Sequence, residues 1–180
     1  MLRFEPTPFY GLIQVLENEY LDPRGSFAKV YEDKLFNPYI GHFDARQVNL
    51  SKNNVSGTVR GFHFQMGPQS EFKIVKCLKG SIYDVLLDTR KDSETYGECL
   101  SFVLSENAPC SLIIPPGVAH AFQTLEDNSY VLYVHTANYS PENSMGFNAL
   151  DTNLNFNWPL PTSIISPQDI ALPLFRKEPS

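Results

Sequence analysis

Short runs of β-branched and aromatic residues, separated by turn-forming residues, fill the chain between residues 55 and 139. The runs lie at residues 72–78, 81–88, 100–104, 111–114, 119–125 and 130–136. Each has the length and composition of a β-strand, and Lys79-Gly80 marks a turn between the first two. Because no helical spacing of apolar residues separates these runs, the pattern predicts an all-β sandwich or barrel.

The two ends of the chain have a different pattern. Residues 11–16 and 41–50 alternate between apolar and polar, and we expect them to add strands to the same sheets or to those of a neighbouring subunit, which would give an intertwined dimer. Residues 30–36 are predicted to form a short helix. Residues 141–180 are rich in Asn, Pro and Ser and are expected to form an ordered loop segment packed on the barrel. Without an internal repeat or a linker, residues 1–180 are predicted to form one domain.

The composition fits a globular protein with its own core, since 42% of the 180 residues are apolar and 19% are charged. Fourteen Lys and Arg against 20 Asp and Glu give a formal charge of −6, which argues against nucleic-acid binding. No apolar stretch approaches the roughly 20 residues of a membrane span, and no secretory signal is evident, so we expect a soluble, cytoplasmic protein without a membrane partner. The odd number of cysteines, Cys77, Cys99 and Cys110, without a C-x-x-C pair, predicts reduced packing residues.

Ionisable residues recur within the predicted strands, and His63 and Gln65 are interpreted as sharing one face of a further strand. Because residues i and i+2 of a strand share a face, five such side chains have compatible positions: His63, Lys73, Asp84, His120 and Tyr133. If these positions face inwards, two imidazoles, an ammonium, a carboxylate and a phenol converge in one cavity. Small barrels usually fill their interior with apolar side chains, so inward ionisable groups need partners or a function. The alternative is that they face outwards into water.

Two phrases, GTVRGFHFQ at residues 57–65 and PPGVAH at residues 115–120, resemble the two sequence motifs of cupin barrels. Metal-binding cupins carry His-x-His and a later Glu in the first motif. Here Gln65 occupies the second His position and the Glu is missing. His63 and His120 alone are too few ligands for a good transition-metal site, so we expect no metal.

A longer ordered set of phrases, from about residue 11 to residue 169, is similar to the dTDP-4-dehydrorhamnose 3,5-epimerase family. The phrases are DPRGSF (22–27), QVNLS (47–51), VRGFHFQ (59–65), YDVLLDTR (83–90), IPPGVAHAF (114–122), LY (132–133), YSPE (139–142), NWP (157–159) and ISPQD (165–169). The resemblance implies an all-β, cupin-type β-sandwich or jelly-roll barrel with short peripheral helices. It also implies an isomerase that uses no cofactor and inverts C3, C5 or both of a nucleotide-linked 4-keto-6-deoxyhexose through an enolate, in the biosynthesis of deoxysugars such as rhamnose for surface polysaccharides.

The resemblance assigns catalytic roles to four side chains. His63 is the expected base, oriented by Asp169, since a neutral imidazole accepts a proton at cytoplasmic pH. Tyr133 is the expected acid on the opposite face of the sugar, and Lys73 is expected to stabilise the enolate oxygen. The alternatives are that Asp169 caps a terminal turn, that Tyr133 is structural, and that Lys73 is exposed, because its phrase SEFKIVK departs from the family's usual Gln-Gly-Lys.

The resemblance also implies a set of substrate-binding residues: Arg24 and Arg60 at the diphosphate, Gln47, Asn49 and Tyr139 at the base or sugar, Phe27 beside the base, and a pair of His120 with Asp84 at the sugar. Arg24 is expected to act across the interface of a homodimer with exchanged N-terminal strands.

Lys29 stands where the family commonly has an acidic residue that contributes to base recognition, so dTDP, GDP and CDP sugars stay open. Hexose and heptose substrates also stay open, as does inversion at one carbon or two. Two other classes of function remain: a non-catalytic barrel that binds a nucleotide sugar or carbohydrate, and a metal-dependent cupin oxygenase or isomerase. A pure binder has no use for an acid and a base on opposed faces, and Gln65 disfavours the metal enzyme.

Overall fold

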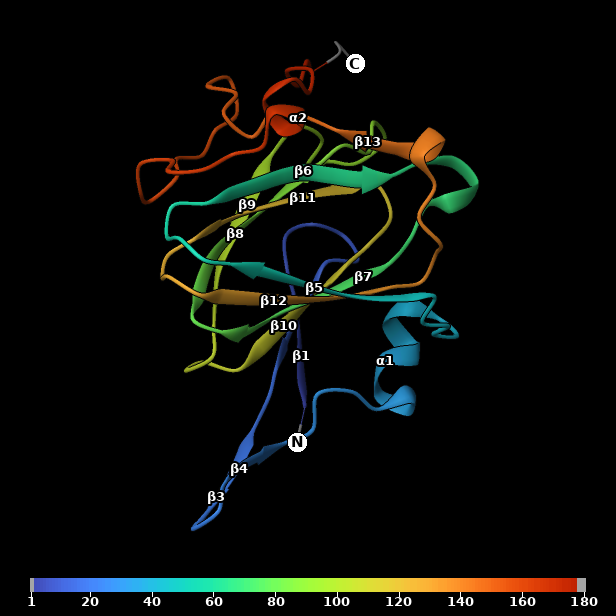
Figure 1. The fold of residues 1–180 in the computed structure, drawn as a ribbon. Helices are drawn as coiled ribbons and strands as arrows, with labels where there is room; N and C mark the ends of the chain where they lie inside the picture. The colour runs from blue at the N-terminus through green and yellow to red at the C-terminus, as the bar shows by residue number, and fades with distance from the viewer. Residues whose placement is uncertain (1, 178–180) are drawn as a thin grey trace.

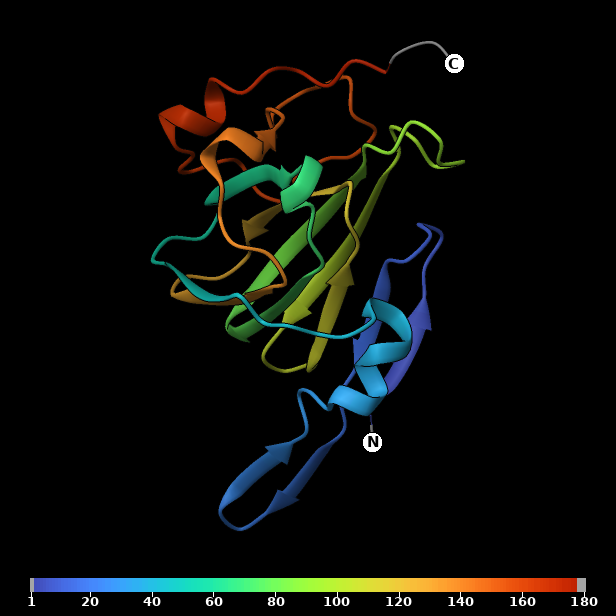
Figure 2. The same cartoon turned by 90° about the vertical axis from the view of Figure 1, so that its right-hand side faces the viewer.

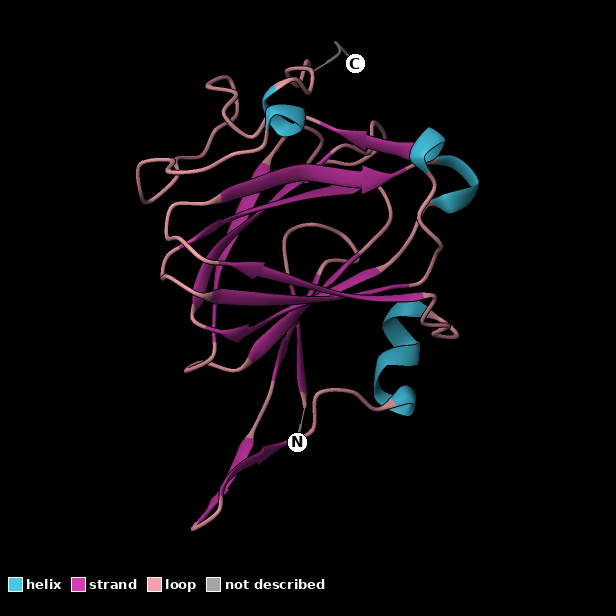
Figure 3. Ribbon diagram, viewed as in Figure 1, coloured by secondary structure: helices cyan, strands magenta, loops and turns pink. Residues whose placement is uncertain are grey.

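Two antiparallel sheets pack face to face in the structure, a computed structural model that describes residues 2–177 (Figure 1). Within these residues the larger sheet has six strands in the order β1-β2-β10-β7-β12-β5, and the smaller has five in the order β13-β6-β11-β8-β9. Most of the regular structure is strand, as Figure 3 shows. The predicted all-β sandwich with short peripheral helices is confirmed.

The elements have the following bounds. The larger sheet contains β1 (Arg3–Pro6), β2 (Ile13–Leu16), β10 (Cys110–Ile114), β7 (Lys73–Lys79), β12 (Ser129–His135) and β5 (Gln47–Asn53). The smaller contains β13 (Ser144–Gly146), β6 (Val59–Gln65), β11 (Val118–Thr124), β8 (Ser81–Asp88) and β9 (Cys99–Ser105). The others are the hairpin strands β3 (Glu19–Asp22) and β4 (Gly25–Ala28), the helices α1 (Asp33–Ile40) and α2 (Pro167–Ile170), and the 3₁₀ turns η1 (Gly67–Gln69) and η2 (Pro141–Asn143).

The main core fills the space between the two sheets, and strand alternation sorts side chains into it. On β8, Leu86 faces inwards with Val75 and Phe122, whereas Val85 and Leu87 face outwards. The outward pair is covered by the C-terminal segment, which lies over the smaller sheet (Figure 2). Strand β8 is therefore covered on both faces, which explains its nearly continuous apolar sequence.

The strands predicted in the middle of the chain are confirmed as β7 to β12, each to within one residue at either end. The alternating segments at 11–16 and 41–50 also contain strands, although β5 begins only at Gln47. The strands β1, β3, β4 and β13 were not predicted individually. Each has four residues or fewer, too short a run for alternation to be read.

The predicted helix at residues 30–36 is displaced, since α1 begins three residues later and ends four residues later. Glu32, immediately before the helix, is still extended. The helix continues through Pro38, although proline usually ends a helix, because Phe36 and Ile40 are both buried against the outer face of the larger sheet.

The hairpin of β3 and β4 projects away from the two sheets (Figures 1 and 2). Its large side chains, Tyr20, Leu21 and Phe27, are exposed. A two-stranded ribbon of this kind is marginally stable alone.

The three cysteines pack as apolar residues, as predicted. Cys77 and Cys110 are buried in the main core and Cys99 is half-buried, and all three are free thiols. Burial raises the pKa of Cys77 to about 11 and that of Cys99 to about 12, so neither forms a reactive thiolate at neutral pH. Among the described residues, no helix has both the length and the apolar character needed to cross a bilayer. Residues 1 and 178–180 of the predicted single domain lie outside the described residues.

Candidate active site

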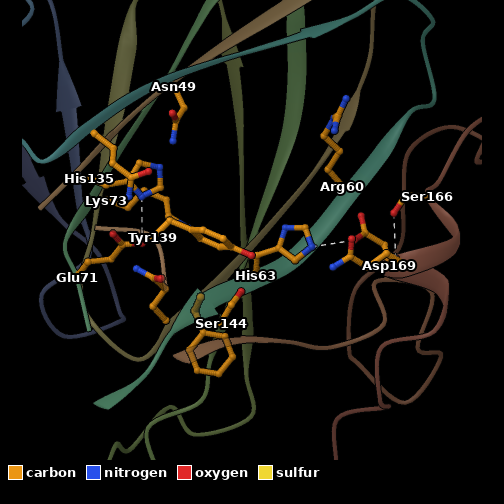
Figure 4. A pocket seen from close by; sticks show the side chains of 14 residues that line it. Asn49, Arg60, His63, Glu71, Lys73, His135, Tyr139, Ser144, Ser166 and Asp169 are labelled. Carbon is orange, nitrogen blue, oxygen red and sulfur yellow. Dashed lines mark hydrogen bonds and ion pairs between the residues drawn. The ribbon is translucent and has the colours of Figure 1, made fainter. Parts of the chain in front are cut away.

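A pocket of about 400 Å³ is lined by residues of β5, β6, β7 and β12 and by the segment that forms α2 (Figure 4). The lining residues are Gln47, Asn49, Arg60, His63, Phe64, Gln65, Glu71, Lys73, His135, Tyr139, Ser144, Ser166, Gln168 and Asp169.

Strand register explains why residues far apart in the sequence meet here. Lys73 on β7 lies opposite His135 on β12, which lies opposite Gln47 on β5. Two residues along, Tyr133 lies opposite Asn49. Directly paired residues share a face, so both rows present their side chains on the same side of the larger sheet.

His63 and Asp169 contact each other although they are 106 residues apart. Nε2 of His63 lies 2.8 Å from Oδ1 of Asp169. The Asp169 side chain is 8% exposed, whereas that of His63 is 49% exposed. The N-cap of α2 is Ser166, whose hydroxyl accepts the Asp169 N–H at 3.0 Å. Because Ser166 caps this turn, the Asp169 carboxylate is available to bind His63.

The environment of Asp169 decides where the proton lies on His63. Burial favours a raised pKa for Asp169, but the hydrogen bond and charge of His63, with the N–H of Gly61, hold that pKa below its usual range. The carboxylate is ionised at neutral pH and can only accept, so Nε2 of His63 carries a proton. In a neutral imidazole this leaves the lone pair on Nδ1, the atom that can act as a base.

The close approach of β6 to β11 depends on Gly61. Its φ is +116°, and a Cβ there would lie 2.5 Å from both the carbonyl oxygen of His120 and the Cα of Ala121. In this register His63 lies directly opposite His120. Gly61 therefore sets the position of His63 against β11, and its own N–H also binds Asp169 at 3.3 Å.

Lys73 lines the pocket but is only 8% exposed. Its side-chain ammonium makes no hydrogen bond or ion pair within residues 2–177. Burial lowers the pKa of Lys73, and the charges of Glu71 and Asp84 oppose this shift. A desolvated ammonium with unused donors is suited to bind an oxygen that gains negative charge.

Tyr133, His120 and Asp84 lie beside the pocket rather than on its lining. The rings of His120 and Tyr133 are 6.0 Å apart, and Nε2 of His120 lies 2.7 Å from Oδ2 of Asp84. Burial lowers the pKa of His120, so the ring is neutral and donates to the carboxylate. Burial and the charge of Asp84 raise the pKa of Tyr133, so its phenol keeps its proton at neutral pH.

The residues expected to bind substrate divide into two groups. Gln47, Asn49, Arg60 and Tyr139 all line the pocket. Arg24 and Phe27 do not, because they lie on the projecting hairpin of β3 and β4.

Two basic residues in or next to the hairpin form ion pairs with acidic residues of the same chain. The Arg24 side chain is 89% exposed and pairs with Asp22 at 2.6 Å. Lys29, the residue that departs from the family's acidic position, forms an ion pair with Glu32.

Gln65 stands at the position where metal-binding cupins have a ligand, and here its side chain forms hydrogen bonds with the backbone of a loop. Its amide nitrogen donates to the carbonyl of Asn138 at 3.2 Å, and its amide oxygen accepts the N–H of Ser140 at 2.8 Å. These bonds hold the loop that carries Tyr139. Across residues 2–177, no three or more His, Cys, Asp or Glu side chains are grouped so that they could hold a metal ion.

Several lining residues had no role assigned from the sequence, among them Glu71, His135, Ser166 and Gln168. For two of them, strand alternation in the sequence indicates a position on the pocket face. His135 lies two residues after Tyr133 and Glu71 lies two residues before Lys73, so alternation places each on the face of a candidate catalytic residue.

Comparison with known proteins gives the family. A model of the family described as dTDP-4-dehydrorhamnose 3,5-epimerase matches residues 6–177. The chain is 37% identical over 153 residues to the dTDP-4-dehydrorhamnose 3,5-epimerase of Sinorhizobium fredii, covering 84% of this chain and 78% of the relative. It is 32% identical over 169 residues to a dTDP-4-dehydrorhamnose 3-epimerase of Streptomyces niveus, covering 93% of this chain and 81% of the relative.

The fold leads to the same family. The crystal structure of dTDP-4-dehydrorhamnose 3,5-epimerase from Bacillus anthracis, with TDP and PPi bound, aligns with a TM-score of 0.92 and 32% identity over 97% of this chain and 100% of that chain. The likeness confirms the expected cupin-type sandwich. The chain belongs to the dTDP-4-dehydrorhamnose 3,5-epimerase family.

Proposed function

We propose that this member of the family is an epimerase that inverts C3, C5 or both of a dTDP-linked 4-keto-6-deoxyhexose. Family membership makes the chain an isomerase that acts on a nucleotide sugar. One observation carries the mechanism: a His63–Asp169 pair lines the same pocket as the Lys73 ammonium, which is unbonded among residues 2–177. Relatives at similar identity include a 3,5-epimerase and a 3-epimerase, so inversion at one carbon or two is left to the test below.

Proton removal and return use different residues in this proposal. Nδ1 of His63 takes the proton from a carbon beside the ketone, and the C–H electron pair moves so that negative charge collects on the ketone oxygen. Lys73 stabilises that oxygen, and Asp169 stabilises the imidazolium. Tyr133 then gives its phenolic proton to the opposite face of the same carbon, which forms a C–H bond of inverted configuration. Exchange with water returns His63 and Tyr133 to their starting states.

We infer that the nucleotide lies toward Arg60 and Tyr139. The Arg60 guanidinium suits bidentate contact with a diphosphate, and the exposed Tyr139 ring offers a face for a base. TDP is the nucleotide in the aligned Bacillus anthracis structure, and this supports a dTDP sugar. Lys29 is paired with Glu32 within the chain, so it need not oppose thymine.

We further propose that the hairpin of β3 and β4 completes the pocket of a second copy in a homodimer. Arg24 and Phe27 carry the two chemistries that a nucleotide end needs, a cation and an aromatic ring, yet both are exposed in their own chain. Exchange of identical elements between protomers is a common route to a dimer.

The test compares two histidine variants with a dTDP-linked 4-keto-6-deoxyglucose, after dialysis against EDTA. His63→Ala should lower the rate of inversion by at least about 10²-fold, because it removes the general base. His42→Ala is the matched control, since His42 is exposed and lies outside the pocket, and it should retain the wild-type rate.

Two results would contradict the proposal. Wild-type protein that binds the dTDP sugar without inverting it would support the non-catalytic binding barrel. Activity that is lost with EDTA and restored by a metal ion would support the metal-dependent alternative.

A further inference from the structure

Glu71 and His135 line the pocket beside Lys73, and neither takes part in the proton transfers described above. Oε1 of Glu71 lies 3.0 Å from Nδ1 of His135, and the two side chains are only 5% and 13% exposed. Oε2 of Glu71 is buried without a hydrogen-bond partner among the described residues. A buried carboxylate with an unbonded oxygen is costly unless a positive charge lies nearby.

Lys73 supplies that charge. It lies opposite His135 in the strand register and two residues after Glu71, and Figure 4 shows the three at one end of the pocket, with Asp169 at the other. An ammonium has three donors, and that of Lys73 uses none of them within residues 2–177. An acceptor without a donor therefore lies on the same pocket wall as a donor without an acceptor.

The charges around Lys73 come from several elements. The ionisable groups that act on Lys73 or lie opposite it are Glu71 before β7, Asp84 on β8, His120 on β11 and His135 on β12. His63 and Arg60 on β6 line the same pocket, and Tyr133 on β12 lies beside it. Glu71 and Asp84 are the two carboxylates whose charges act on Lys73. Asp84 is completely buried and bound to His120 through Oδ2, with Oδ1 unbonded among the described residues, whereas Glu71 forms part of the pocket lining.

We propose that Glu71, clamped by His135, is a positioning residue that acts through Lys73, because its charge keeps the Lys73 ammonium protonated where it lines the pocket to meet the ketone oxygen of the substrate. The proposal rests on the proposed function of Lys73. Burial alone favours the neutral amine, which cannot stabilise an enolate by its charge. The Glu71 carboxylate opposes this effect, and the bond to His135 fixes the place from which it does so.

The test substitutes Glu71→Gln, which keeps the shape of the side chain and removes its charge. Glu17→Gln is the matched control. Glu17 is also buried and pairs at 2.6 Å with Lys76, which lies on β7 as Lys73 does, but Glu17 does not line this pocket. Two quantities are measured for each variant: the titration of Lys73 by NMR of ¹³C-labelled lysine, assigned with Lys73→Arg, and the pH profile of kcat.

Glu71→Gln should lower the titration midpoint of Lys73 by about one pH unit, because an attractive charge is lost. The alkaline limb of kcat should move down by the same amount, since Lys73 then loses its proton at lower pH, and KM should change little. Glu71→Asp should keep most of the wild-type titration, and Glu17→Gln should keep all of it. If Glu71→Gln is unstable, the shorter pair Glu71→Asp and Glu71→Asn gives the same comparison.

An unchanged Lys73 titration in Glu71→Gln would overturn the inference, whatever happens to activity. A different result would contradict the proposed function without contradicting this inference. If wild-type protein inverts no sugar while the Lys73 midpoint still falls in Glu71→Gln, the electrostatic link stands and the epimerase proposal is wrong.

Discussion

The proposed base, His63, and the proposed cation, Lys73, lie in opposite environments. The His63 ring is half exposed but bound through Nε2 to a buried carboxylate, so Nδ1 is accessible while the orientation of the ring is fixed. Lys73 is desolvated and unbonded within the described residues, so its charge acts strongly on whatever oxygen enters. A base must be reached by the carbon acid, whereas a cation gains strength from the exclusion of water.

Asp169→Asn tests what the carboxylate contributes to His63, because the variant keeps the His63 side chain and removes the charge of its partner. The amide cannot stabilise an imidazolium by charge, so we expect the rate of inversion to fall by at least about 10²-fold while the protein stays folded. The lowered pKa of Asp169 adds a pH signature. The ionised carboxylate stabilises the fold above the unfolded-state pKa, near 3.8, and this contribution is lost as pH falls through the lower folded-state value.

Chemical denaturation at pH 7 and near pH 2 measures how much the ionised Asp169 contributes to the free energy of unfolding. Wild-type protein should exceed Asp169→Asn in free energy of unfolding at pH 7, and the difference should shrink toward pH 2. A difference that grows as the pH falls would contradict the assignment of Asp169 as an ionised partner of His63.

At the scale of elements, the site depends on how β6, β11 and α2 come together. Alternation and turn residues predicted the central strands to within one residue, because each signal is local. The contact of His63 with Asp169 joins residues 106 apart, and only the family resemblance brought them together. Glu71 and His135 had the right alternation, but nothing local indicated that the two side chains would bond.

Gly61→Ala tests the close approach of β6 and β11. The Cβ would meet backbone atoms at 2.5 Å, so we expect a loss of at least about 3 kcal/mol in the free energy of unfolding, or no folding. Gly41→Ala is the control, since Gly41 also has a positive φ, of +69°, but open space around the new Cβ. Gly41→Ala should cost about 1–3 kcal/mol from backbone strain alone, because its φ of +69° with a ψ of −153° favours glycine, and less than Gly61→Ala. Equal losses in the two variants would show that backbone strain alone, without the strand contact, accounts for Gly61.

At the scale of the whole molecule, the site of one chain lacks two of the residues expected to bind substrate. The alternation of apolar and polar residues does not predict that Arg24 and Phe27 lie outside the pocket, because nothing in their local sequence distinguishes them from other strand and turn residues. Only the projection of the hairpin away from the body shows that they do not line the pocket of their own chain. An interface between copies is set by assembly and leaves little trace in local sequence.

Subunit mixing tests whether the hairpin acts on a second copy. Arg24→Ala and His63→Ala should each be impaired, but a heterodimer of the two combines an intact His63 with an intact Arg24 in one of its two pockets. Random exchange of subunits should restore about a quarter of the wild-type rate, because half of the dimers are mixed and each has one whole site. No recovery in a mixture shown to exchange subunits would place Arg24 and His63 in the pocket of the same chain.

Solvent deuterium exchange, followed by proton NMR at C3 and C5 of a dTDP-linked 4-keto-6-deoxyglucose, tests the proposed proton transfers most directly. Wild-type protein should incorporate deuterium at each carbon that it inverts, because the returned proton comes from a group that exchanges with water. Tyr133→Phe should still exchange deuterium at the carbon deprotonated by His63, but form the inverted product at least about 10²-fold more slowly. Inversion without deuterium, or inversion by Tyr133→Phe at the wild-type rate, would contradict a mechanism in which His63 removes the proton and Tyr133 returns it.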